Sequence, residues 1–138
     1  MFVHETKLRV RYGETDQMGV VYYGNYALYY EVARVEALRS LGMTYKGLEE
    51  SGVMMPVAEV TSKYIRPAKY DDELTIRTVI AKLPTASMHF EYEILNEAGV
   101  LLHKGTTVLV FINMKTNRPV RCPEELYTKL KTYLEPIQ

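Results

Sequence analysis

Two hydrophobic periods divide the chain. Residues 26–41 follow the helical period of about 100° per residue, which produces two apolar rows. One row contains Tyr26, Tyr30, Ala33, Ala37 and Leu41, and the opposite row contains Leu28, Val32 and Val35. Apolar rows on both sides are typical of a buried helix. Asn25 suits the N-cap of this helix, and Gly42 suits the position just past its end.

The rest of the chain alternates with a period of two, which indicates strands. We expect five of them, over residues 3–12, 57–66, 73–83, 87–95 and 100–113. A short helix or turn is expected over 44–51, and a terminal helix begins near Pro123. The pattern predicts a single α+β domain over residues 1–138, with a long helix wrapped by a curved, five-stranded antiparallel sheet. Such a sheet covers only part of the helix, so a second copy of the chain could cover the rest.

Composition narrows the function classes. Lys and Arg together number 17, as do Asp and Glu, so the formal net charge is zero. The sequence also has no stripe of basic residues, so nucleic-acid binding is not expected. The lone cysteine, Cys122, fits a reducing compartment and is expected to be an ordinary thiol. The N-terminus lacks the order of a signal peptide, and no apolar run is long enough for a membrane span. These features predict a soluble cytoplasmic protein.

Tyrosine is the dominant aromatic residue, with twelve tyrosines and no tryptophan. Several of them crowd into residues 22–30. A buried tyrosine must place its hydroxyl on a partner or in water, so this cluster suits a partly wet cleft or an interface. The alternative is that the rings pack the helix against the sheet.

The turn between Gly13 and Gly19 holds the candidate chemistry, because Asp16 lies just upstream of the helix start. The ordinary role of such an aspartate is to accept hydrogen bonds from its own loop. The functional alternative pairs Asp16 with the backbone N–H of Tyr23, since the first amides of a helix lack internal partners and can stabilise an oxyanion. Gly24 would let a substrate approach closely. This chemistry needs neither a metal nor an organic cofactor, and the three histidines, His4, His89 and His103, lack ligand-like spacing.

The stretch GETDQMGVVYYGNYALYYEVARVE resembles the signature of the 4-hydroxybenzoyl-CoA thioesterase-like hotdog proteins, in particular the acyl-CoA thioesterase branch with the tol–pal-associated enzymes. The resemblance continues through SKYIRPAKYDDELTI, TASMHFEYEI and VFIN, and covers roughly residues 5–125. It implies a hotdog fold and dimers that join two sheets edge to edge. It also implies that Asp16 is the catalytic aspartate and that the Tyr23 backbone N–H polarises the thioester carbonyl.

The chain departs from this family pattern at two places. Many tol–pal-associated relatives carry histidine where Tyr23 stands, which leaves the backbone role intact but excludes imidazole chemistry there. Some relatives hold coenzyme A with arginines where this chain has Pro84 and Thr85. Lys82 and Arg118 are the remaining candidate cations, and Arg118 matches a family cation; for both, a solvated surface charge is the commoner role.

The combined expectation is an acyl-CoA thioesterase for short-chain, medium-chain or aromatic thioesters. Asp16 would be nucleophile or general base, Tyr26 and Tyr30 would wall the acyl pocket, and a neighbouring subunit of a homodimer or homotetramer would complete the site. The alternative is a non-catalytic hotdog module that binds acyl-CoA or acyl carrier protein. A hotdog dehydratase is disfavoured, because no histidine lies near Asp16 in sequence.

Overall fold

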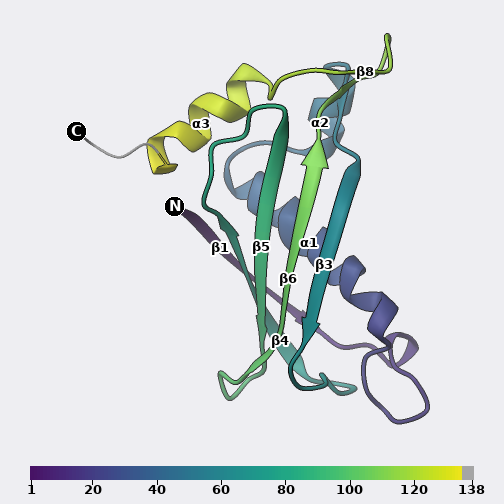
Figure 1. Cartoon of the computed structure of the whole chain (residues 1–138). Helices are drawn as coiled ribbons and strands as arrows, with labels where there is room; N and C mark the ends of the chain where they lie inside the picture. The colour runs from purple at the N-terminus through teal and green to yellow at the C-terminus, as the bar shows by residue number, and fades with distance from the viewer. Residues whose placement is uncertain (135–138) are drawn as a thin grey trace.

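A five-stranded antiparallel sheet lies against one long helix in the computed structural model, which describes residues 1–134 (Figure 1). The strand order is β1-β4-β5-β6-β3. These strands are β1 (Phe2–Arg9), β3 (Val57–Tyr64), β4 (Glu73–Ile80), β5 (Ser87–Leu95) and β6 (Leu101–Val110). The helices are α1 (Tyr26–Ser40), α2 (Tyr45–Glu50) and α3 (Glu124–Leu134), with short 3-10 helices η1 (Tyr12–Glu14) and η2 (Tyr23–Asn25). The predicted α+β architecture is confirmed.

A second, small sheet was not predicted, and the single strand expected over residues 100–113 is wrong, because its last two residues belong to this sheet. It has the order β2-β7-β8 and consists of β2 (Val53–Met54), β7 (Ile112–Asn113) and β8 (Arg118–Pro119). Strands this short carry too few residues to show an alternating pattern. Among residues 1–134, no helix is both long and apolar enough to cross a membrane.

The core forms between α1 and the inner face of the sheet. On β5 every second side chain is buried, and these four residues are Met88, Phe90, Tyr92 and Ile94. On β4 the alternation buries Leu74, Ile76, Thr78 and Ile80. Because side chains alternate between the two faces of a strand, each strand presents its apolar row to the helix and its polar row outward.

Helix α1 is buried on one side only. Tyr26, Tyr30, Ala33 and Ala37 are buried as the first apolar row predicts, but Leu28 is 51% exposed and Val32 is 42% exposed. The single chain therefore covers only part of the helix, as expected for a sheet of this size, because the sheet lies against one side alone. Leu28 and Val32 form an apolar strip that the described chain does not cover.

The two edge strands of the large sheet differ in burial. Every residue of β3 is exposed, whereas β1 alternates and buries Phe2 at its start. Strand β3 also carries exposed apolar side chains on its length, including Val57, Val60 and Tyr64. An unpaired apolar edge of this length is a template for pairing with another strand.

Candidate active site

The acidic turn is a tight loop closed by backbone hydrogen bonds. Thr15 and Val21 form an antiparallel bridge across it. Inside this bridge the Asp16 amide donates to the Val20 carbonyl at 2.9 Å, and the Gly19 amide donates to the Asp16 carbonyl at 3.0 Å. Gly19 has φ +77°, a conformation that favours glycine. The backbone position of Asp16 is therefore fixed by its own loop.

The carboxylate of Asp16 accepts a hydrogen bond through one of its two oxygens. Its Oδ1 accepts a hydrogen bond from the Met18 amide at 2.9 Å, which is the ordinary loop role considered for this residue. No hydrogen bond to Oδ2 is recorded within the described chain, and the side chain is partly exposed. One oxygen thus stabilises the turn while the other is available to solvent or a ligand.

The opening of α1 lies directly after this loop. Tyr23 and Gly24 belong to η2, which continues into the helix at Tyr26. The Asn25 amide donates to the Tyr22 carbonyl at 2.9 Å, but no acceptor for the Tyr23 amide is recorded in residues 1–134. The first amides of a helical segment carry partial positive charge, so an unpaired amide here suits an electron-rich oxygen.

Gly24 has little room for a side chain. A Cβ at this position would lie 3.0 Å from the Tyr22 ring, so a side chain would press on that ring. The carbonyl of Tyr23 accepts a hydrogen bond from the Tyr64 hydroxyl at 3.2 Å, which ties η2 to the end of β3. The helix opening therefore lies beside the uncovered edge strand.

Of the two tyrosines expected to wall the acyl pocket, only Tyr26 borders a cavity near the helix opening. This cavity has a volume of about 170 Å³ and is lined by Val21, Tyr26, Tyr64, Ile65, Arg66 and Pro67. Tyr30 is fully buried, and its hydroxyl is hydrogen-bonded to Ser62 Oγ at 2.6 Å and His103 Nε2 at 2.5 Å. Tyr30 thus belongs to the core between α1 and β6.

His103 is a buried residue that the sequence interpretation treated only as a poor metal ligand. Its ring stacks on Tyr26 at 3.9 Å, and its Nδ1 has no hydrogen-bond partner in the structure. Burial lowers the pKa of His103 to about 4, so the ring is neutral near pH 7. The available signal was its phase, since His103 shares a strand face with Gly105, Thr107 and Leu109, all buried.

Lys82 and Arg118 lie at the other end of the sheet from the acidic turn. Lys82 follows the end of β4 and Arg118 lies on β8, whereas the acidic turn follows the end of β1, beside the start of β4 (Figure 1). Both cations are exposed. A single chain therefore does not bring them together with Asp16.

Other reactive residues stay apart from this site. The described residues contain no group of three histidine, cysteine, aspartate or glutamate side chains able to hold a metal ion. Cys122 is half-buried near α3, where burial raises the pKa of its thiol to about 12. Its thiolate is therefore scarce at neutral pH.

Comparison with known proteins gives three consistent findings. The Thioesterase-like superfamily matches residues 10–130. Putative acyl-CoA thioesterase YneP of Bacillus subtilis is 33% identical over 121 residues, which are 88% of each chain, and acyl-CoA thioester hydrolase YbgC of Escherichia coli O6:H1 is 32% identical over 90% of this chain and 92% of its own. A DHNA-CoA thioesterase structure from Staphylococcus aureus has a TM-score of 0.89 and 34% identity, covering 96% of this chain and 93% of that one.

The fold and the site define a hotdog protein with an acidic turn at the opening of its central helix. The chain belongs to the thioesterase-like superfamily. The relatives confirm the predicted class of enzyme, a thioester hydrolase.

Proposed function

We propose that the protein hydrolyses acyl-CoA thioesters, with Asp16 as nucleophile or general base and the Tyr23 backbone N–H as oxyanion donor. One observation carries this proposal. In the described part of the chain, the Asp16 carboxylate, with its Oδ2 free of hydrogen bonds, and the unpaired Tyr23 amide lie within one segment, residues 14–25, that backbone hydrogen bonds close on itself. The names of the relatives YneP and YbgC support the same reaction.

Two routes use the same carboxylate. As nucleophile, Asp16 attacks the thioester carbonyl carbon, the C–S bond breaks, and the coenzyme A thiolate takes a proton from water; water then hydrolyses the resulting anhydride. As general base, Asp16 removes a proton from the water that attacks this carbon directly; the C–S bond then breaks, and the coenzyme A thiolate takes up the proton held by Asp16. In both routes the carbonyl oxygen becomes negative, and the Tyr23 amide would stabilise it.

A second copy of the chain would complete this site. Antiparallel pairing of two β3 strands would place the Val57 end of one beside the Tyr64 end of the other. The small sheet with Arg118 lies near the Val57 end, and the acidic turn lies near the Tyr64 end. A two-fold pair would therefore bring Arg118, and the end of the sheet with Lys82, from one copy toward Asp16 of the other. The exposed Leu28–Val32 strip would be covered in the same contact.

The non-catalytic alternative rests on one observation, the hydrogen bond that engages Asp16 Oδ1 in its own loop. A panel of short-chain, medium-chain and aromatic acyl-CoA thioesters separates the two functions, with a thiol-reactive dye to detect coenzyme A release. Turnover of any member supports hydrolysis. Binding of the thioesters without release across the panel would favour a binding module. The same panel on acyl carrier protein distinguishes the two carriers.

A further inference from the structure

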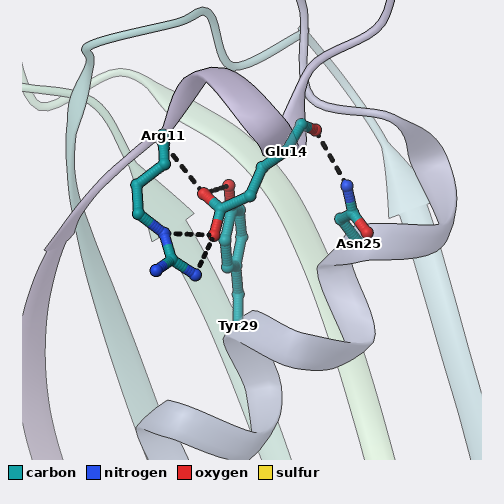
Figure 2. Close-up of polar contacts among 4 residues, drawn as sticks. All are labelled: Arg11, Glu14, Asn25 and Tyr29. Carbon is teal, nitrogen blue, oxygen red and sulfur yellow. Dashed lines mark hydrogen bonds and ion pairs between the residues drawn. The ribbon is translucent and has the colours of Figure 1, made fainter.

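Glu14 lies two residues before Asp16 and has a nearly buried carboxylate, whose side chain is 12% exposed. Its Oε1 accepts hydrogen bonds from the Arg11 amide and from the Tyr29 hydroxyl, each at 2.9 Å. Its Oε2 accepts from Arg11 Nε at 3.0 Å and Arg11 Nη2 at 2.9 Å. Figure 2 shows the carboxylate between the guanidinium and the phenol. The side chain thus joins the end of β1 to the first turn of α1.

The backbone of Glu14 makes a second connection to the same helix. Its carbonyl accepts a hydrogen bond from the Tyr22 amide at 3.0 Å. The same carbonyl accepts a second one from Asn25 Nδ2 at 2.8 Å (Figure 2). Tyr22 immediately precedes Tyr23. The Glu14 carbonyl therefore binds residues on both sides of Tyr23, the candidate oxyanion donor. Glu14 also lies two residues before Asp16, the candidate nucleophile.

The ionised form of Glu14 is favoured. Burial alone would raise the pKa of this carboxyl, but hydrogen bonds from Arg11 and Tyr29 outweigh it, and the pKa lies below its usual value. Burial and the adjacent Glu14 carboxylate raise the pKa of Tyr29, which remains a protonated donor at neutral pH. Charge-assisted hydrogen bonds of this kind are short and strong, so they hold their partners firmly.

We propose that Glu14 is a positioning residue of the thioesterase site, which holds the Asp16 loop and the Tyr23 amide at a fixed separation through its contacts with Arg11, Tyr29 and the helix opening. This inference rests on the proposed function. Glu14 itself touches neither reacting atom, so its effect passes through Asp16 and Tyr23. Small displacements of reacting groups are costly, because a shift of about 1 Å can lower a rate by about 100-fold.

The variant Glu14→Gln keeps the side-chain length and can still accept from Tyr29, but it loses the ion pair with Arg11. We expect kcat to fall by about 10- to 100-fold while KM changes by less than about twofold, since the loss concerns geometry of reaction and not binding. Tyr29→Phe removes a single hydrogen bond and should lower kcat by a smaller factor. Glu93→Gln is the matched control, because Glu93 pairs with Arg77 at 3.1 Å on the outer face of the sheet. It should behave as wild type.

A double-mutant cycle separates positioning from a general loss of folded protein. If Glu14 holds Asp16 relative to the Tyr23 amide, adding Glu14→Gln to Asp16→Asn causes a smaller further loss than Glu14→Gln causes alone, because one of the two positioned groups is already gone. Multiplying losses in the double variant would overturn the proposal. So would wild-type kcat for Glu14→Gln beside an inactive Asp16→Asn.

Amide hydrogen exchange over residues 15–24 gives a readout that does not depend on activity. Faster exchange in Glu14→Gln than in Glu93→Gln supports the positioning role of Glu14, and equal exchange overturns it. A fully active Asp16→Asn variant would instead remove the proposed catalytic role of Asp16. The exchange data alone would then decide whether Glu14 holds residues 15–24 in place. If Glu14→Gln does not fold, Tyr29→Phe carries the same kinetic and exchange comparisons.

Discussion

The Tyr30 hydroxyl occupies the space in which a side chain at Gly105 would begin. A Cβ at position 105 would overlap the Tyr30 hydroxyl and ring, and this hydroxyl is held in place by hydrogen bonds with Ser62 and His103. Tyr30 also stacks on Tyr92 with ring centroids 4.5 Å apart, so the ring has little room to withdraw. Close approach of α1 to β6 thus requires a glycine at position 105.

Gly105→Ala should lower the free energy of unfolding by about 1–3 kcal/mol, because overpacking forces the backbone or the Tyr30 ring to shift. Urea denaturation of the variant and the wild type measures this change. Gly13→Ala is the control, since a Cβ at Gly13 meets nothing within 4 Å. Equal free energies of unfolding for the two variants would contradict this prediction, because they would mean that the protein accommodates a Cβ beside Tyr30 without loss of stability.

His103 should make stability depend on pH in a defined window. Burial lowers its pKa from 6.5 to about 4 in the folded protein. Between these two values the unfolded chain binds more protons, so the free energy of unfolding falls as the pH falls. The stability that depends on a neutral His103 ring is fully present above pH 6.5. It amounts to about 3 kcal/mol, at 1.36 kcal/mol per pKa unit.

The variant His103→Gln isolates this contribution. Urea denaturation at pH 7 and at pH 4.5 gives the loss of stability on acidification for each protein. Wild type should lose about 2–3 kcal/mol more than the variant, since carboxylates contribute to both and cancel in the difference. The same loss in both proteins would mean that His103 is not the group that titrates.

The edge strand β3 supplies a test of assembly. Val60→Lys places a charge on an exposed apolar edge, and such charges oppose strand pairing. We expect the wild type to sediment as a dimer or tetramer and Val60→Lys to sediment as a monomer, with activity at least about 10-fold lower if the site needs both copies. Val3→Lys is the matched control, because Val3 is an exposed valine on β1, the opposite edge. A monomeric wild type, or an oligomeric and active Val60→Lys, would contradict the assembly.

Much of the fold follows from local patterns in the sequence. The alternation over residues 87–95 predicts β5 at its observed bounds, and the first apolar row of the helix predicts the buried side of α1. Partial coverage of the helix was expected from the size of the sheet, but a helical wheel does not show that Leu28 and Val32 are the residues left exposed. Coverage of a helix is a property of the whole assembly.

The candidate site was only partly predictable, because side-chain contacts join distant residues. The hydrogen bond of Asp16 to its own loop could be inferred from sequence, because an aspartate in a turn commonly accepts such a bond. Glu14 and Tyr29 are 15 residues apart, and their contact depends on how β1 meets α1. The burial of His103 likewise depends on the rings of Tyr26 and Tyr30, which come from α1.

The turnover number of Asp16→Asn with the best acyl-CoA substrate tests the central claim most directly. Asparagine keeps an oxygen for the Met18 amide, so the turn should form, and the melting temperature and oligomeric state should match the wild type. We expect kcat to fall by about 100-fold or more, because the amide is neither a nucleophile nor a base. A folded Asp16→Asn protein with near-wild-type kcat would contradict the account.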